Sequence, residues 1–387
     1  MMKLFRTPKD IVFGSGALEY LKQIKGKKAF IVSDKTMEDI GFVKKIADYL
    51  KLAGLETQAF CEVTPDPTRE ISEKGAAQMQ VFSPDWIVAL GGGSSIDAAK
   101  AMWVLYEYPD ITWETVFTAT PELRKKAKMI AIATTSGTGS EATCAAVITN
   151  SNVEPHFKEV IASPEVLPDI AIADPDLAAK MPPKVTAATG MDVLTHAIES
   201  YTSIAATVID KSLAMSAIKM VFESLPKAYA DGRNIAAREE MHTASLMAGM
   251  AFTNSFLGIV HSLAHQLGSV FGIPHGAANS LMLPYVIKFN SIAVSDLYAE
   301  IAKAIDISFT DKKDAVNKLV DAIFELQTDI ELASTIKEYG IDEKQFNDTL
   351  DALAKNAYND ICVYCNPRVP SIQDMKNLYI EAFYGNK

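Results

Sequence analysis

The sequence predicts an α/β N-terminal domain with a mostly parallel sheet, followed by an all-helical C-terminal domain. Two observations support this fold class. In the first half, short apolar runs alternate with helical patterns, an order typical of a parallel sheet with helices on both faces. From about Thr186 onward, almost every segment has helical periodicity, and runs of β-branched residues are few. Pro182 and Pro183 stop any element between the halves, so we expect domains of residues 1–183 and 184–387.

Four strands and two helices can be placed in the first domain. Each expected strand is a short apolar run, and two of these runs lead into segments with helical periodicity. The expected strands are residues 28–34, 85–93, 128–135 and 169–175. The expected helices are residues 41–54 and 94–106.

The composition limits size, partners and compartment. A chain of 387 residues is too long for one ordinary domain. Its 37 basic and 48 acidic residues give a net charge of −11, which argues against nucleic acid or an anionic membrane as a partner. The first residues contain no apolar segment of the signal-peptide kind, and four cysteines do not make a disulfide framework. We therefore expect a reduced, cytoplasmic protein.

A long uncharged segment holds most of the histidines. No Asp, Glu, Lys or Arg occurs from Met241 to Ile287, which indicates burial in a protein core or a membrane. Core helices are favoured, because the part long enough to cross a bilayer, Met241 to Val260, carries polar residues and has no basic flank. Buried histidines need polar partners. The four of the six histidines in this segment are His242, His261, His265 and His275.

Two glycine-containing turns follow expected strands in the first domain. Gly91 to Gly93 lie between a strand and a helix, where glycine lets the backbone approach a ligand and the helix start favours a diphosphate. The turn from Thr134 to Ser140 adds five hydroxyl groups and two glycines. A plain tight turn also explains the first motif, but the two turns together predict a nucleotide site. The first strand ends in VSDKTM rather than GxGxxG, so the fingerprint is atypical.

The segment ATGMDVLTHAIESY predicts a helix with two different faces. Its apolar face consists of Met191, Leu194, Ile198 and Tyr201. Asp192, His196 and Glu199 lie on another face. Asp and His four residues apart can converge on one ion, although a hydrogen-bonded helical pair explains the same spacing.

Two histidines from the uncharged segment would complete a four-ligand metal site. One carboxylate with imidazoles suits Fe(II) or Zn(II) rather than Mg or Ca, which prefer oxygen. His261 and His265 are four residues apart and could bind as a pair, while His275 lies in a loop before an expected helix start. The spacing does not choose two of these three. His156 and His242 have no such neighbours, and we expect them to be ordinary surface or core residues.

Over nearly its whole length, the sequence resembles the iron-dependent, or group III, alcohol dehydrogenases. The most specific segments are ALGGGSSIDAAK, TTSGTGSEAT, GMDVLTHAIESY, and VHSLAHQLG followed by GIPHGAANSLMLP. The resemblance implies a dehydroquinate synthase-like fold and reversible hydride transfer between NAD(H) and a small primary alcohol or aldehyde. It also implies Fe(II), alternatively Zn(II), held by Asp192, His196, His261 and His275. His265 then lies outside the ligand set, near the nicotinamide and the substrate, as the catalytic histidine.

The resemblance also implies cofactor and substrate contacts. The cofactor-binding set is Asp34, Gly92, Gly93, Ser94, Thr134, Thr135, Thr138, Asn150 and Lys158, and Asn150 stands where many relatives have Asp. Phe252 and Cys362 fall where relatives line the substrate pocket. A carboxylate at position 34 can accept hydrogen bonds from the ribose hydroxyls of NAD and would repel the 2′-phosphate of NADP, so we expect NAD.

Ala145 replaces a polar residue found in some relatives, which favours a simple primary alcohol over a vicinal diol. The alternative function is a dehydroquinate synthase-like lyase, whose phosphorylated, carboxylated substrate would need a pocket rich in Lys and Arg. The uncharged segment around the histidines argues against it. We also expect a homo-oligomer, dimer or higher, with no nucleic-acid or membrane partner.

Overall fold

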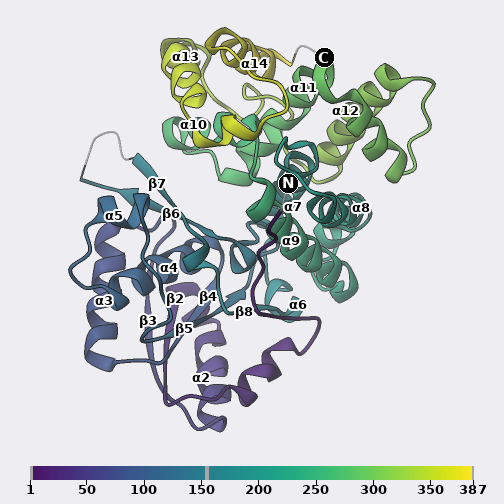
Figure 1. Cartoon of the computed structure of the whole chain (residues 1–387). Helices are drawn as coiled ribbons and strands as arrows, with labels where there is room; N and C mark the ends of the chain where they lie inside the picture. Colours follow the sequence, from purple (N-terminus) through teal and green to yellow (C-terminus); the bar gives the residue numbers. More distant parts are fainter. Residues whose placement is uncertain (1–2, 153–156, 386–387) are drawn as a thin grey trace. The chain divides into compact units, whose positions relative to one another are not determined.

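A computed structural model describes residues 3–152 and 157–385 of the chain, so His156 lies outside the described residues. The chain divides into two compact units, Met1–Ala179 and Lys180–Lys387, shown in purple to teal and in teal to yellow in Figure 1. The first unit contains the sheet and the second is helical, which confirms the expected fold class.

The first unit alternates strands and helices. Its strands are β1 (Asp10–Phe13), β2 (Lys28–Asp34), β3 (Glu56–Val63), β4 (Trp86–Gly91), β5 (Lys128–Ala133), β6 (Ala145–Asn150), β7 (Phe157–Ala162) and β8 (Ile170–Ala173). Its α-helices are α1 (Lys35–Asp39), α2 (Phe42–Leu52), α3 (Arg69–Phe82), α4 (Gly93–Glu107), α5 (Trp113–Thr118) and α6 (Pro175–Ala178). Three short 3₁₀ helices are η1 (Ala17–Gln23), η2 (Ser140–Ala142) and η3 (Pro164–Val166).

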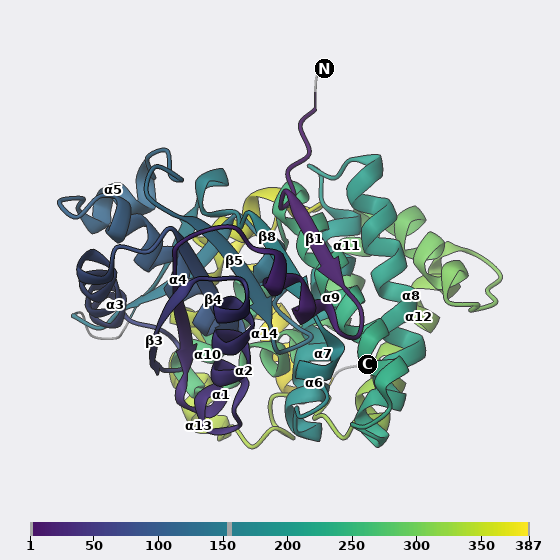
Figure 2. The same cartoon turned by 90° about the horizontal axis from the view of Figure 1, so that it is seen from below.

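Six strands of the first unit form one parallel sheet in the order β1-β8-β5-β4-β2-β3. Figure 2 shows β1 at one edge of this sheet and β3 toward the other. From β2 the chain passes to β3 on one side and returns to β4 on the other side. The carboxyl ends of β2 and β4 therefore flank the topological switch point, where ligands bind in open α/β sheets.

Each central strand is buried on both faces. Phe30 and Val32 of β2 pack in one core with α3 and α4, whereas Ala29 and Ile31 pack in a second core with α2 and η1. Two covered faces explain why β2, β4, β5 and β8 are nearly continuous apolar runs that could be recognised in the sequence.

Several elements of the first unit were not predicted. β3 is half exposed at the sheet edge, and its residues ETQAFCEV mix polar and apolar types. β6 and β7 form a separate antiparallel hairpin, and α3 precedes β4.

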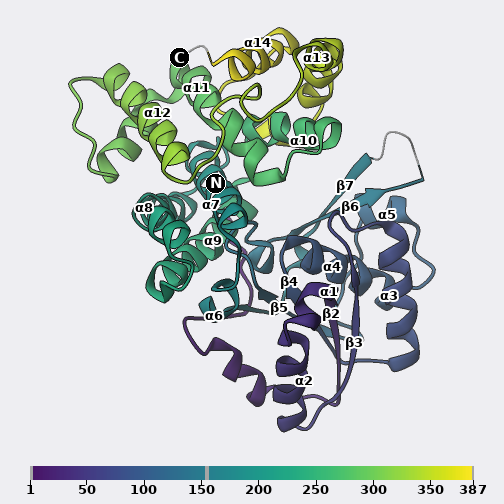
Figure 3. The ribbon, with the colours of Figure 1, turned by 180° about the vertical axis from the view of Figure 1, so that it is seen from behind.

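The second unit is formed by helices, several of which are visible in Figure 3. They are α7 (Pro183–Thr202), α8 (Val208–Ala230), α9 (Ile235–Ser255), α10 (Ile259–Phe271), α11 (His275–Ala304), α12 (Lys312–Asp329), α13 (Glu343–Tyr358), η4 (Ile361–Cys365) and α14 (Ile372–Tyr384). No strand is assigned in the part of this unit that the structure describes.

The uncharged segment is a core segment, as predicted. It comprises most of α9, all of α10 and the first part of α11, and most of its residues are buried. The chain bends by 108° between α9 and α10, and the turn between them contains Phe256, with a positive φ of 59°, and Gly258. Within the described residues, no single helix has the length and apolar character to cross a membrane, and only this bent pair meets those two criteria jointly.

Candidate active site

Four side chains from three helices of the second unit converge on one point. α7 supplies Asp192 and His196, α10 supplies His261, and α11 supplies His275, and one ligand atom of each lies within 4.8 Å of all the others. The Nε2 atoms of the three histidines lie close to Asp192 Oδ1. The distance is 3.8 Å for His196, 3.9 Å for His261 and 3.5 Å for His275. Ligands bonded tetrahedrally at 2.0–2.1 Å are separated by about 3.4 Å, so these residues fit one ion with little movement.

Asp192, His196, His261 and His275 are called the ligand set below, and burial disfavours protonation of two of its imidazoles, those of His261 and His275. Desolvation lowers the pKa of His261 well below its usual range, and His196 lowers it further. The same effect lowers the pKa of His275, although 39% of its side chain is exposed and Asp192 opposes the shift. Burial alone would raise the pKa of Asp192, but the neighbouring imidazoles and Asn279 reverse this and lower it. Neutral imidazoles and an ionised carboxylate are the protonation states that bind metals.

A close helix contact brings His275 to Asp192. A Cβ atom at Gly276 would lie 2.0 Å from the carbonyl oxygen of Ala188, so only glycine lets the start of α11 approach α7 this closely. His275 is the first residue of α11, and Gly276 follows it directly.

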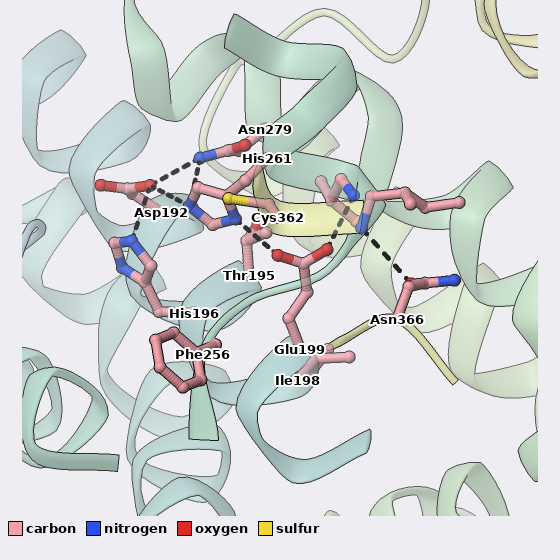
Figure 4. Close-up of polar contacts among 12 residues, drawn as sticks. Asp192, Thr195, His196, Ile198, Glu199, Phe256, His261, Asn279, Cys362 and Asn366 are labelled. Atoms are coloured by element: carbon pink, nitrogen blue, oxygen red, sulfur yellow. Dashed lines mark hydrogen bonds and ion pairs between the residues drawn. The ribbon is translucent and has the colours of Figure 1, made fainter. Parts of the chain in front are cut away.

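Asn279 and Glu199 bind the ligand set from outside. Asn279 Nδ2 donates to Asp192 Oδ1 at 2.7 Å and lies 3.2 Å from Nε2 of both His261 and His275. Glu199 Oε2 lies 2.6 Å from His261 Nδ1 (Figure 4). Burial raises the pKa of Glu199 to about 7, although hydrogen bonds with the backbone amides of Gly258 and Val260 act to lower this pKa. The sequence placed Glu199 on the face of Asp192 and His196 but assigned it no role, and Asn279 was missed.

The spacing of Asn279 was the available signal. It is a buried polar residue four positions after His275, in a stretch of α11 without charged residues. Residues four apart on a helix share a face, so its amide points to the same place as the imidazole.

His265 belongs to a second group, with Asp360 and Cys362. Its Nδ1 lies 2.8 Å from Asp360 Oδ2, and its ring stacks on that of His275 with centroids 5.5 Å apart. Burial opposes ionisation of Asp360, but the hydrogen bond with His265 lowers its pKa to about 2. Burial raises the pKa of Cys362 well above that of an ordinary thiol, so this sulfur is not a thiolate. Asp360 was not anticipated from the sequence.

The two residues expected at the substrate pocket lie near these groups. The Phe252 ring stacks on His196 with centroids 4.4 Å apart. Cys362 is in the group of His265 and Asp360. Both offer mainly apolar surface.

In the first unit, the two glycine-containing turns touch each other. A Cβ atom at Gly92 would lie 3.3 Å from the Thr135 side chain, and one at Gly93 would lie 2.9 Å from Thr138. The Thr134 amide donates to the Gly91 carbonyl at 3.0 Å. Ser94 follows in the first turn of α4, whose 15 residues begin at Gly93. The structure thus gathers the expected phosphate-binding residues at the carboxyl ends of β4 and β5.

Asp34 ends β2 beside the glycine turn. Its Oδ1 accepts a hydrogen bond from the Met37 amide and its Oδ2 accepts one from Ser95 Oγ at 3.2 Å. Lys35 points to other carboxylates, at 2.8 Å from Glu38 and 3.1 Å from Asp39.

Asn150 and Lys158 lie on the β6–β7 hairpin. Asn150 Oδ1 accepts from the Asn152 amide, and Lys158 Nζ pairs with Asp66 at 2.6 Å. These contacts are local to the hairpin and the loop before α3.

A buried lysine braces the second turn, and sequence reasoning missed it. The Lys100 ammonium is fully buried and donates to oxygen atoms of Ser140, Thr143 and Ala145 at 2.7–3.2 Å. Asp97, one helical turn earlier, accepts from Ser140 Oγ and the Val147 amide. This network fixes the segment that follows the hydroxyl-rich turn.

A cluster of nitrogen and oxygen ligands and a glycine-containing turn between a parallel strand and a helix are typical of metal-dependent oxidoreductases that use a dinucleotide. Comparison with protein families is more specific. Residues 8–175 match the model of the iron-containing alcohol dehydrogenases, and residues 186–383 match the C-terminal model of the Fe-containing alcohol dehydrogenase family. The chain belongs to the iron-containing alcohol dehydrogenase family.

Individual relatives agree with this assignment. The chain is 46% identical to the NADPH-dependent butanol dehydrogenase of Clostridium saccharobutylicum, over all of this chain and 99% of that protein. It is 37% identical to the NAD-dependent methanol dehydrogenase of Bacillus methanolicus, over 98% and 100% of the two chains. A crystal structure of 1,3-propanediol oxidoreductase superposes with a TM-score of 0.92 at 36% identity, covering 99% and 100%.

These comparisons confirm the family and the enzyme class expected from the sequence. The chain is a nicotinamide-linked alcohol dehydrogenase of the iron-containing type. The matches with alcohol dehydrogenases decide against the dehydroquinate synthase-like lyase.

Proposed function

We propose that this enzyme interconverts a small primary alcohol and its aldehyde, using NAD(H) and one metal ion held by Asp192, His196, His261 and His275. The observation that carries the proposal is the convergence of three imidazole Nε2 atoms on the Asp192 carboxylate at 3.5–3.9 Å. Neutral imidazoles and one carboxylate suit Fe(II) or Zn(II). The family to which the chain belongs supports Fe(II), with Zn(II) as the alternative.

His265 is the proton acceptor in this proposal. A divalent ion held by Asp192, His196, His261 and His275 would supply Lewis acidity, which favours loss of the hydroxyl proton of an alcohol. The Asp360 carboxylate accepts from His265 Nδ1, so the Nε2 atom keeps a lone pair that can take a proton. The stacking on His275 keeps His265 beside the ligand set. The nicotinamide supplies the hydride acceptor or donor.

A short primary alcohol suits the side chains that the family resemblance assigns to the substrate. Phe252 and Cys362 offer apolar surface to a hydrocarbon chain. Ala145 has no side-chain group that could bind the second hydroxyl of a vicinal diol. The names of two relatives, a butanol and a methanol dehydrogenase, support the same substrate class.

The cofactor in this proposal is NAD(H), bound at the switch point of the first unit. Gly92, Gly93 and Ser94 at the start of α4, with Thr134, Thr135 and Thr138, would hold the diphosphate. Asp34 would bind the adenosine ribose, and Asn150 and Lys158 would contribute from the hairpin. Lys35 already pairs with Glu38 and Asp39, so a 2′-phosphate at Asp34 would meet an acidic surface. Because one relative is an NADPH-dependent enzyme, the cofactor preference is tested by comparing kcat/KM for NADH and NADPH.

An assay of anaerobically purified protein reloaded with Fe(II) tests the proposal. We expect NADH-dependent reduction of butyraldehyde, and loss of both activity and bound metal in Asp192→Ala and His261→Ala. His242→Ala is the matched control, because His242 is also buried on a helix of this unit but lies outside the ligand set. Full metal content and full rate in either ligand variant would overturn the assignment.

We expect a homo-oligomer of two or more chains in the cytoplasm, free of nucleic acid and membrane. None of the four cysteines forms a disulfide, which agrees with a reducing compartment. Sedimentation at several protein concentrations would contradict the oligomer if only a single-chain mass were found.

A further inference from the structure

Glu199 is buried beside the ligand set without being part of it. It lies on α7, on the face of Asp192 and His196, and its side chain is only 5% exposed. Nothing in the four-ligand proposal uses it. A carboxylate with no charged role would be costly at this depth unless its oxygen atoms are bound.

Both oxygen atoms of Glu199 are bound by α10. Oε2 lies 2.6 Å from His261 Nδ1 (Figure 4). Oε1 accepts a hydrogen bond from the Val260 amide at 2.7 Å. When Glu199 is ionised, its carboxylate only accepts hydrogen bonds, so His261 then carries its proton on Nδ1. The other nitrogen, Nε2, then has the lone pair and faces Asp192 Oδ1 at 3.9 Å.

The start of α10 is shaped to receive this carboxylate. A Cβ atom at Gly258 would lie 2.8 Å from Glu199 Oε1 and 2.9 Å from Asn366 Oδ1, so glycine is required for the close approach. Asn366 Oδ1 accepts from the Ile259 amide at 3.3 Å and is itself fixed by Asn290. Two side chains from elsewhere in the unit thus cap the helix that carries His261.

We propose that Glu199 is a positioning residue of the metal site. It fixes the tautomer and the ring orientation of His261, so that Nε2 is offered to the ion, and it anchors the helix that carries the ring. This inference rests on the proposed ligand set, in which His261 is a ligand. Carboxylates that orient a ligating histidine in this way typically change metal affinity by 10–100-fold when they are removed.

The variant Glu199→Gln tests the role because it keeps the shape and removes one acceptor. A glutamine has one oxygen for two N–H donors, so either the Val260 amide loses its partner or the glutamine amide donates to Nδ1. The second arrangement moves the proton of His261 to Nε2 and withdraws that atom from the ion. We expect the Kd for Zn(II), measured by competition with a chromophoric chelator, to rise by about 10-fold or more.

Glu300→Gln is the matched control. Glu300 accepts a hydrogen bond from Tyr201, also on α7, and it lies outside the ligand set. We expect the control to change the Kd for Zn(II) by less than about twofold. A Glu199→Gln protein that binds Zn(II) as tightly as the wild type, or no more weakly than Glu300→Gln, would overturn the positioning role.

A measurement on the wild-type apoprotein avoids dependence on the folding of any variant. Nitrogen-15 NMR of the imidazoles, at a pH where Glu199 is ionised, should show the Nδ1–H tautomer at His261, and an Nε2–H tautomer would overturn the inference. The variant His261→Ala separates the two proposals. If His261→Ala loses Zn(II) while Glu199→Gln retains it, only the role of Glu199 fails, and if His261→Ala retains it, both proposals fail.

Discussion

His265 is held differently from the three histidines beside it. Its Nδ1 is bound by Asp360, whereas the Nε2 atoms of His196, His261 and His275 surround Asp192 Oδ1. A histidine–carboxylate pair of this kind suits proton transfer, because the second nitrogen can accept a proton.

We therefore predict that His265→Ala keeps its metal and loses turnover by about 10²-fold or more, the usual contribution of a positioned acid–base group. Metal content and kcat are measured on the same preparation. Loss of the metal would contradict this role and would point to His261 and His265 as a ligand pair at four-residue spacing.

Asp34 should decide the choice of cofactor. Like-charge repulsion at its carboxylate, weakened by solvent screening, predicts that kcat/KM for NADH exceeds that for NADPH by at least about 10-fold. Asp34→Gly should remove most of this preference by admitting the 2′-phosphate. Lys35→Ala is the control, and we expect it to leave the ratio unchanged because Lys35 is paired with Glu38 and Asp39. A wild-type enzyme that favours NADPH would refute the prediction and assign the phosphate to Lys35.

Among the elements, the contact between α7 and α11 depends on one glycine. The Ala188 carbonyl oxygen leaves no room for a Cβ atom at Gly276, and backbone cannot move aside as a flexible side chain can. Gly276→Ala should cost about 1–3 kcal/mol of unfolding free energy, as overpacked sites do, and should weaken metal binding by displacing His275.

Gly340→Ala separates the two effects of that change. Gly340 has open space around it and a positive φ of 105°, so alanine there strains only the backbone. We expect this control to lower stability, measured by urea unfolding, without changing metal affinity. Normal metal affinity in Gly276→Ala would show that the helix contact does not position His275.

The short helix η2, which follows the glycine-containing turn from Thr134 to Ser140, contains a buried carboxyl group. Glu141 is 1% exposed, and its Oε1 has no hydrogen-bond partner among the described residues. Burial raises its pKa from 4.5 to about 7, and Lys100 opposes the shift. A folded-state pKa above the unfolded value gives stability that is present below 4.5 and lost as the pH rises through 7.

We predict that Glu141→Gln increases the free energy of unfolding at about pH 8.5, on the order of 2 kcal/mol, and has little effect at about pH 4. The amide stays neutral at both values, whereas the buried carboxyl group ionises at the higher one. Urea unfolding of both proteins at the two pH values measures the difference. An equal effect at both values would show that ionisation of Glu141 is not involved.

For the whole molecule, the sequence predicted the parts with strong periodic or compositional signals. The four doubly covered strands were recognised because burial on both faces makes them continuous apolar runs. The edge strand β3 and the β6–β7 hairpin were missed, because half-exposed strands mix polar and apolar residues and resemble loops.

Some residues of the candidate site could be predicted from the sequence, and others could not. The spacing of Asp192 and His196 on α7 indicated a ligand pair, and the uncharged segment indicated buried histidines. Spacing could not choose among His261, His265 and His275, because the outcome depends on how α10 and α11 pack against α7. Asp360 and Lys100 act through tertiary contacts with residues distant in the sequence, and no local sequence pattern indicates such contacts. Asn279 also contacts distant Asp192, but its four-residue spacing from His275 was a local signal.

The central claim is that one ion is bound by three imidazole nitrogens and one carboxylate oxygen. X-ray absorption fine structure of the Zn(II)-loaded wild-type protein tests it most directly. The account predicts only nitrogen and oxygen neighbours, at about 2.0–2.2 Å. A sulfur neighbour at about 2.3 Å would contradict it and would place the ion with His265, Asp360 and Cys362 instead.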